Sequence, residues 1–314
     1  MFRRAMLRHQ AMCSTLFFMS DTLLDIARRY AKAPADRDVA RTPIPGLTVI
    51  CETTPTALQY AINKPLICLV LQGSKRVALG ARTFDFGAGE TLLITADVPT
   101  VSQITRADIR SPYFSIVIDL DPAVIASLVV EMGSAPFAAG MPVRVDPTES
   151  EVADAVLRLM RLVDRPVALA VLQTQLIREL HFWLLSGKHG GAIRSLGVAD
   201  SHAQRVARAV TYIRANFAKP LRAEHLAEAA GMSTSALYEH FRAITSLTPL
   251  QFQKQHRLIE ARRMMLANGT PISNAAYAVG YKSIPQFTRE YSGMFGLPPA
   301  RDMKTAKTRI HSVA

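Results

Sequence analysis

The sequence predicts an α+β protein in which a β-barrel domain precedes an all-helical domain. Short β-rich runs separated by turn residues occupy residues 46–120, whereas the chain from residue 201 onward shows only helical patterns. The charge distribution agrees with this division. The chain from residue 200 to the C-terminus carries 16 basic and 7 acidic residues, while the charges of residues 19–199 sum to zero. A neutral domain is therefore joined to a strongly basic one.

Composition excludes several classes of protein. The 314 residues are 49% hydrophobic and 20% charged, which argues against disorder and against a coiled-coil rod. No apolar stretch approaches the ~20 residues that span a bilayer, so we expect no transmembrane helix. Cys13, Cys51 and Cys68 are widely spaced and lack a CxxC motif, which predicts a reduced, cytoplasmic protein without a disulfide framework. The net charge of +12 favours a polyanionic partner, with nucleic acid first and an anionic membrane surface second.

The elements follow in order along the chain. We interpret residues 1–18 as an incorrectly assigned or disordered extension, with Met19 as the natural start. Residues 19–186 form the first domain, with the barrel at about 46–120 and helices over 122–186. A Gly-rich flexible linker covers residues 187–200, the basic helical domain covers 201–303, and 304–314 is a basic tail. The predicted strands are LTVICE, LICLVLQG, KRVAL, RTFDF, ETLLIT, VSQIT and YFSIVID.

Three helices close the first domain. Asp121 as N-cap and Pro122 at the first helical position predict a helix over 122–132. Two more are expected over 149–163 and 166–186. The last one repeats apolar residues with a 3.6-residue period, which is typical of a core face or of a dimer interface. This stripe consists of Leu169, Leu172, Leu176, Leu180, Trp183 and Leu184.

The basic domain contains an internal repeat. LAEAAGMSTSALYEHFRAITSLTP aligns with NAAYAVGYKSIPQFTREYSGMFGLPP about fifty residues further on. Each copy predicts a helix, a sharp turn at Gly and a second helix that starts at a capping Ser or Thr. The matched pairs are Leu237 with Phe287, Phe241 with Tyr291, Leu247 with Leu297, Pro249 with Pro299 and Gly231 with Gly280.

This pattern is a helix-turn-helix repeated twice in one chain. The second helix of such a unit can lie in a DNA major groove. A long helix over about 249–267 is expected to join the two copies and to set their separation. Two copies in the basic part of the chain favour nucleic-acid binding much more strongly than one copy would.

These residues resemble a known family. AAYAVGYKSIPQFTREYSGMFGLPPARD is similar to the A-x-x-x-G-[FY]-x-S-x-x-x-F-x-R-x-[FY]…FG-x-x-P pattern of the AraC/XylS-type transcriptional regulators, and the likeness extends over residues 201–303. Residues 45–132, with PLICLVLQGSKRV, FGAGETLLI and IDLDPAVIASLVVEM, resemble the sensing domain of an AraC-type subfamily. The resemblance implies a cupin-like barrel that binds an effector, mediates dimerisation, or does both.

The resemblance also implies which residues contact DNA. Arg289 is the leading candidate, because a guanidinium can bond guanine O6 and N7 together, and Gln286 suits adenine. Glu239 and Ser246 depart from the family pattern, which often has Arg and Gly there. The expected base contacts are Ser235, Tyr238, Glu239, Ile284, Pro285, Gln286 and Arg289. The expected phosphate contacts are Arg242, Lys254, Arg257, Lys282 and Arg301, each of which is otherwise an ordinary solvated charge.

The predicted barrel lacks the residues of an enzyme. No histidine lies between residues 40 and 120, and Glu52 and Glu90 stand alone, so we expect neither a metal nor another cofactor. No nucleophile elbow, P-loop or dinucleotide fingerprint is present. An apolar barrel interior suits a small apolar or aromatic effector. Cys68 is a candidate for effector sensing through its thiol, with a small core residue as the alternative.

The sequence therefore predicts a cytoplasmic, one-component transcriptional regulator. The expected partners are double-stranded operator DNA, a small-molecule effector and a second copy of the chain in a homodimer, with RNA polymerase as a further candidate. A sensor or interaction protein with non-specific polyanion binding is the alternative. A cupin-type enzyme is a more distant one.

Overall fold

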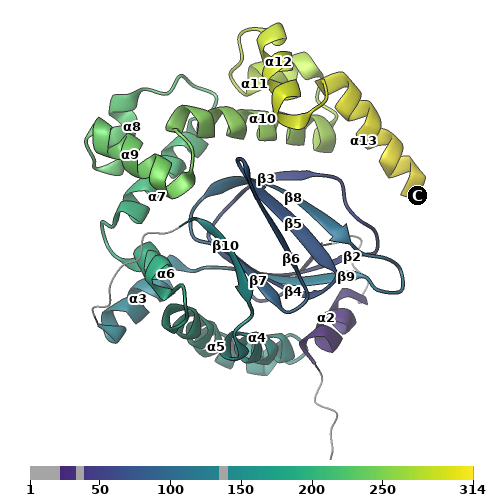
Figure 1. Ribbon diagram of the computed structural model, residues 1–314, viewed down its shortest axis with the longest axis vertical. Coiled ribbons are helices and arrows are strands. Elements are labelled where there is room, and N and C mark those ends of the chain that lie inside the picture. The colour runs from purple at the N-terminus through teal and green to yellow at the C-terminus, as the bar shows by residue number, and fades with distance from the viewer. Residues whose placement is uncertain (1–21, 33–38, 134–140, 314) are drawn as a thin grey trace, which may run out of the picture.

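Two antiparallel sheets form the first domain, and helices form the second (Figure 1). The computed structural model describes residues 22–32, 39–133 and 141–313. One sheet has the order β1 (Val39–Arg41), β2 (Leu47–Glu52), β9 (Tyr113–Asp119), β4 (Leu66–Gln72), β7 (Glu90–Ile94) and β10 (Val143–Pro147). The other has the order β3 (Gln59–Asn63), β8 (Val98–Arg106), β5 (Ser74–Leu79) and β6 (Arg82–Gly87). The α+β class is confirmed, with two facing sheets in place of a single closed barrel.

Helices flank the sandwich on both sides. The first domain carries α2 (Leu23–Lys32), α3 (Pro122–Met132), α4 (Ser150–Leu162), α5 (Pro166–Ser186) and α6 (Gly190–Gly197). The second domain consists of α7 (His202–Ala215), α8 (Ala223–Ala230), α9 (Thr234–Thr245), α10 (Pro249–Asn268), α11 (Ile272–Ala278), α12 (Ile284–Phe295) and α13 (Pro299–Val313). Figure 1 shows α2, α4 and α5 below the six-stranded sheet, and α10 crossing above the four-stranded one.

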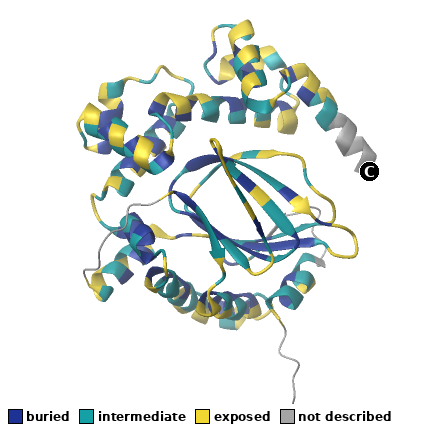
Figure 2. Ribbon diagram, viewed as in Figure 1, coloured by how far each residue is buried: buried dark blue, intermediate teal, exposed yellow. Residues whose placement is uncertain are grey.

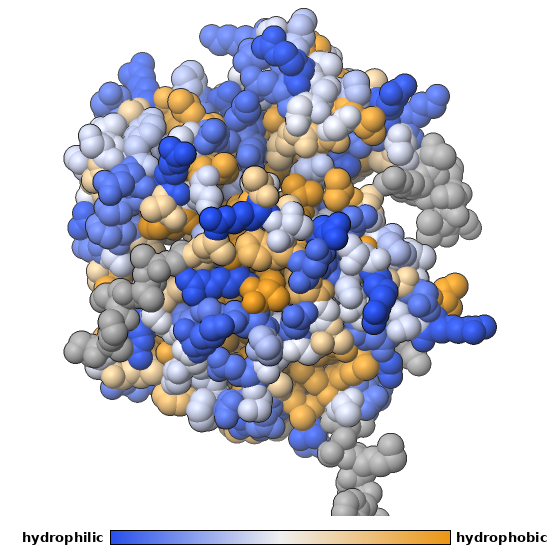
Figure 3. All heavy atoms as spheres, in the orientation of Figure 1, coloured by the Kyte–Doolittle hydropathy of each residue, from blue (hydrophilic) through white to orange (hydrophobic). Residues whose placement is uncertain are grey.

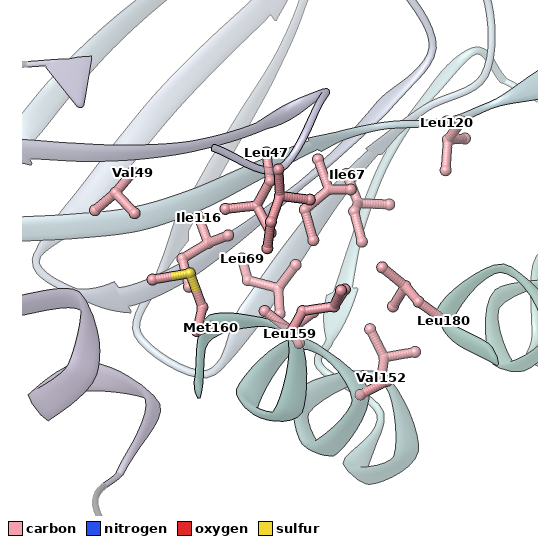
Figure 4. Close-up of a cluster of buried hydrophobic side chains, with 14 of the residues drawn as sticks. Leu47, Val49, Ile67, Leu69, Ile116, Leu120, Val152, Leu159, Met160 and Leu180 are labelled. Carbon is pink, nitrogen blue, oxygen red and sulfur yellow. The ribbon is translucent and has the colours of Figure 1, made fainter. Parts of the chain in front are cut away.

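The central strand β4 is buried on both faces, which explains its uninterrupted apolar sequence. Ile67 and Leu69 belong to the core that the six-stranded sheet shares with α4 and α5, where they lie near Leu159 and Leu180 (Figure 4). Alternate residues of the strand point the other way because side chains in a strand have a period of two. Cys68 therefore packs between the two sheets.

Strands β1, β3 and β10 have no counterpart among the sequence predictions. Each lies at the edge of its sheet, and β3 has only half-buried and exposed residues. Strand β10 ends at Pro147, which is tolerated at an edge because proline cannot donate a hydrogen bond to a neighbouring strand. Strands β3 and β10 are only partly buried, so they lack the apolar runs that identify the inner strands.

The structure corrects the predicted flexible linker. Residues 190–197 form helix α6, in which Ile193 and Arg194 are buried. A Cβ atom at Gly197 would lie 2.5 Å from the backbone nitrogen of Ala126, so glycine is needed for α6 to approach α3. The glycines of this segment permit close packing and do not indicate a mobile connection.

Two other predicted boundaries fall differently. The basic tail expected over 304–314 begins inside α13, which continues to Val313. The expected extension, residues 1–18, and Cys13 lie outside the described residues. In the part of the chain that the structure describes, no helix is both long and apolar enough to cross a bilayer.

The second domain contacts the first through an ion pair and through an aromatic cluster. Arg214 of α7 pairs with Asp97 between β7 and β8, with 2.7 Å between Nη1 and Oδ1. Burial raises the pKa of the Asp97 carboxyl, and the Arg214 guanidinium acts in the opposite direction. Tyr60 of β3 meets the ring of Phe295 edge-on, with 4.6 Å between ring centroids. The guanidinium of Arg262 lies over both rings.

His181 of α5 is hydrogen-bonded to the start of α3. The backbone N–H of Asp121 donates to His181 Nε2 (2.9 Å), and Nδ1 lies 2.7 Å from the carbonyl oxygen of Ile177. Both bonds are satisfied by a neutral ring that carries its proton on Nδ1. Burial lowers the pKa of His181 below its usual 6.5.

We predict that acid weakens this domain through His181. Below pH 6.5 the His181 ring takes up a proton in the unfolded chain, whereas in the folded chain it stays neutral. The free energy of unfolding should therefore fall by at most about 1.4 kcal/mol per pH unit. His181→Gln should flatten this slope in urea titrations followed by Trp183 fluorescence. His225→Gln, at an exposed position, is the control that should leave the slope unchanged. A slope in His181→Gln as steep as that of the unaltered protein would contradict the prediction.

Candidate nucleic-acid interface

The first helix-turn-helix unit is formed by α8 and α9. Its turn contains Gly231 at φ 64°, and α9 begins at Ser233, whose side chain accepts the backbone N–H of Ala236. Leu237 and Phe241 on the inner face of α9 are fully buried. The outer face is left free, as a recognition helix requires.

The second unit, α11 and α12, repeats this construction. Ser283 caps α12 by accepting the N–H of Gln286, and Phe287 and Tyr291 are fully buried like their partners in the first unit. The Tyr291 hydroxyl donates to Asp302 (2.7 Å), which also receives Nε of Arg262 (2.8 Å). Burial raises the pKa of Tyr291, so this hydroxyl stays protonated and keeps α12 and α13 joined. The repeat read from the sequence thus corresponds to two similar structural units.

Helix α10 joins the two units and is fixed at both. Thr248 caps it in a capping box with Gln251. The amide of Gln253 donates to the carbonyl oxygens of Phe217 (3.0 Å) and Lys219 (2.8 Å). Arg257 bonds the same two carbonyls through Nε (2.6 Å) and Nη2 (2.9 Å).

This clamp corrects the role predicted for Arg257. Its guanidinium satisfies two carbonyl groups of the segment between α7 and α8 and is half-buried, so it holds the domain together and is not a free phosphate contact. The partner carbonyls lie 38 to 40 residues away along the chain, which is why a helical pattern alone does not reveal them.

The exposed faces of α9 and α12 contain most of the predicted base contacts (Figure 2). On α9, Ser235 and Glu239 are exposed and Tyr238 is half-buried. On α12, Pro285, Gln286 and Arg289 are exposed.

Ile284 differs from the other predicted base contacts. It is half-buried and packs against the core of the second unit, so less of its side chain is open to a base than at the exposed Pro285, Gln286 and Arg289. Its place in the first turn of α12 turns its side chain toward the core, one position before the exposed Pro285.

Gln286 and Arg289, on the exposed face of α12, differ in whether their side chains already form a hydrogen bond. The amide of Gln286 donates to Glu290 (3.2 Å), which also accepts the Tyr281 hydroxyl (2.8 Å), so Gln286 must release this bond to meet a base. Arg289 makes no hydrogen bond or ion pair with any described residue. Its guanidinium is therefore available for bidentate bonding.

The remaining predicted phosphate contacts are all exposed: Arg242, Lys254, Lys282 and Arg301. Lys254 lies 3.8 Å from Glu290, a loose pair that water screens. Arg242 points from α9 toward a cavity at the sensing domain. On the face in Figure 3, hydrophilic residues predominate in the upper part, which the helix-turn-helix units form, and apolar groups gather lower down.

The interior of the sandwich holds no open site at Cys68. Cys68 is 2% exposed and packs with Phe86 and Tyr113 in the core between the sheets. This is the alternative that the sequence left open, a small core residue. The described residues contain no cluster of three or more His, Cys, Asp or Glu that could hold a metal ion.

The fold and the paired units define a tandem helix-turn-helix protein with an antiparallel β-sandwich domain. A family model described as the AraC-type transcriptional regulator N-terminus matches residues 43–192, and a helix-turn-helix domain model matches residues 226–305. XylDLEGF operon transcriptional activator 2 of Pseudomonas putida is 30% identical over 106 residues, 32% of this chain and 67% of that protein. The chain belongs to the AraC-type family of transcriptional regulators.

One further relative matches over a shorter part of its length, and one solved structure matches in fold. The regulator ArgR of Pseudomonas aeruginosa is 28% identical over 105 residues, which are 33% of this chain and 32% of that protein. The chain thus matches about a third of this relative. The solved structure of Vibrio cholerae ToxT with a bound unsaturated fatty acid has a TM-score of 0.54 at 12% identity, covering 84% of this chain and 97% of ToxT. That similarity shows a shared fold.

The space around the two turn glycines, Gly231 and Gly280, leads to a prediction. A Cβ at Gly280 would lie 2.0 Å from the carbonyl oxygen of Ala218, and φ there is 90°. We expect Gly280→Ala to lower the free energy of unfolding by about 3 kcal/mol or more, because the backbone must move. Gly231→Ala, where the nearest atom is the end of Arg208 at 3.5 Å, should cost only about 1–2 kcal/mol. Urea titrations followed by circular dichroism compare the two variants. Equal losses of unfolding free energy in both would contradict this prediction.

Proposed function

We propose that this protein is a sequence-specific DNA-binding transcriptional regulator. Helices α9 and α12 enter successive major grooves about one turn, ~34 Å, apart on one face of the duplex. The observation that carries this proposal is the pair of similarly built units held at a fixed separation by α10. Basic side chains around them neutralise phosphates and set the register.

The proposed base contacts follow the exposed faces. Arg289 reads guanine, and Gln286 reads adenine after leaving Glu290. Ser235, Tyr238 and Glu239 of α9 and Pro285 of α12 complete the surface. Arg242, Lys254, Lys282 and Arg301 are the proposed phosphate contacts.

Control by a small molecule is the second part of the proposal. ToxT, which shares the fold, was solved with an unsaturated fatty acid and with (E)-4-(8-methylnaphthalen-1-yl)but-3-enoic acid. The first domain here contacts both helix-turn-helix units, through Ile244 and Phe295. An effector that binds one relative orientation better than another shifts the population that binds DNA.

Selection of genomic DNA fragments by the full-length protein tests sequence-specific binding. We expect enrichment of sites that share two short elements about ten base pairs apart. Arg289→Ala should relax preference at one position by ~1–3 kcal/mol, while Arg301→Ala should weaken all sequences alike and lower the salt slope by about one. Uniform binding that salt abolishes, with no enriched element, would favour the alternative of non-specific polyanion binding.

We further propose that the protein acts as a homodimer through α5. Most of the predicted apolar stripe faces the core, but an exposed apolar face remains beside it, formed by Val167, Val171 and Leu172. Val167 is 82% exposed and Val171 is 64% exposed, which is unusual for neighbouring aliphatic side chains.

A charge on this face should prevent dimerisation. Val171→Asp is expected to sediment as a monomer at concentrations where the unaltered protein is a dimer. Ile109→Asp, at an equally exposed site in another part of the molecule, is the control and should stay dimeric. A monomeric unaltered protein, or a dimeric Val171→Asp variant, would rule out this interface.

A further inference from the structure

The two recognition helices carry opposite charges at the same place. The fifty-residue repeat pairs Glu239 of α9 with Arg289 of α12. The residues two positions before and two positions after each of them are fully buried apolar or aromatic side chains. These four are Leu237, Phe241, Phe287 and Tyr291. The two units therefore share their inner contacts and differ in the charge that they present outside.

Helix geometry turns both charged side chains away from the cores. Two positions along an α-helix correspond to a rotation of about 200°, so Glu239 lies on the side of α9 opposite to Leu237 and Phe241. Arg289 has the same relation to its buried neighbours on α12. Both charged side chains are exposed. Each lies on the face that a recognition helix turns toward base edges.

The carboxylate of Glu239 is free, in contrast to the carboxylate of α12. Glu239 forms no hydrogen bond or ion pair with any residue that the structure describes, Arg242 on the next turn included. Glu290 of α12 is half-buried and accepts hydrogen bonds from the Tyr281 hydroxyl (2.8 Å) and the Gln286 amide (3.2 Å). The carboxylate of Glu290 is therefore used inside the domain, whereas that of Glu239 is available to a ligand.

A free carboxylate on this face can distinguish the four bases. When it is ionised it only accepts hydrogen bonds, and the phosphates of the duplex repel it. In the major groove guanine presents two acceptors, and thymine presents an acceptor beside its methyl group. Adenine presents an amino group beside the acceptor N7, whereas cytosine presents its N4 amino group without an acceptor next to it. Cytosine is therefore the base that suits Glu239 best.

We propose that Glu239 selects cytosine in the DNA element that α9 reads, while Arg289 at the matching place on α12 selects guanine in the other element. The proposal rests on the DNA-binding function given above and assigns a base to one of its contact residues. N4 of cytosine donates to the Glu239 carboxylate. Guanine at the same position sets two acceptors against an unpaired negative charge, which weakens binding. The two units therefore share a fold but read different bases.

Exchanging the charge tests the assignment. Duplexes would be selected from a random library by the full-length protein and by its Glu239→Arg variant, and the Kd of each would be measured for operators that differ only at the selected position. We expect the unaltered protein to prefer cytosine over guanine by about tenfold or more, and the variant to reverse this preference. The other element should be the same in both selections. Arg289→Glu should make the reverse exchange, from guanine to cytosine, in that other element.

Glu228→Arg is the matched control. Glu228 is an exposed carboxylate on α8, so this variant changes the net charge by the same amount. It should strengthen binding to all sequences alike and keep the preference for cytosine. Glu239→Gln removes the charge at nearly constant size and should reduce this preference to less than about threefold. If the thermal unfolding of Glu239→Arg does not match that of the unaltered protein, Glu239→Gln decides the question.

The assignment is wrong if the selected base stays the same in Glu239→Arg and all affinities shift equally, as in the control, because Glu239 is then an ordinary solvated charge. A base other than cytosine, in the unaltered protein, at the position that responds to Glu239→Arg would also overturn it. Both outcomes leave the enriched elements, and so the proposed function, intact. Selection that enriches no element with the unaltered protein would instead overturn the proposed function itself, and the assignment with it.

Discussion

One helix, α10, belongs to the hydrophobic cores of both helix-turn-helix units. Phe252 near its start is buried in the first core, while Leu258 and Met265 are buried in the second. A helix of 20 residues is about 30 Å long, close to one turn of DNA. The clamp of Gln253 and Arg257 on the end of α7 prevents the helix from rotating against the first unit. The separation of the two reading faces is therefore set by packing.

Side-chain contacts also hold the helical domain against the sensing domain. The Arg214–Asp97 pair and the contact of Tyr60 with Arg262 and Phe295 attach different parts of the helical domain to the first domain. A ligand between the domains has to favour one arrangement over another to have any effect. A cavity of about 1060 Å³ beside α9 has walls from both domains and from the segment between them.

The sequence predicted the features that depend on local pattern. Inner strands such as β4 and capped helices such as α3 were recognisable because burial on both faces and capping residues leave a clear signature. Three of the four edge strands (β1, β3 and β10), the packed helix α6 and the contacts of Ile284 and Arg257 were not, because local pattern does not show the neighbours that they meet in the fold. The cavity beside α9 has walls from both domains, so the pattern of neither domain alone indicates it.

The fixed separation of α9 and α12 is tested most directly by changing the spacing of the DNA elements. Operators would carry about five or about ten extra base pairs between the two elements, and the Kd of the full-length protein would be measured for each. A rigid α10 predicts that both insertions weaken binding about tenfold or more, to the level of a single element, because phase alone cannot restore the distance. Unchanged affinity for either operator would contradict the account.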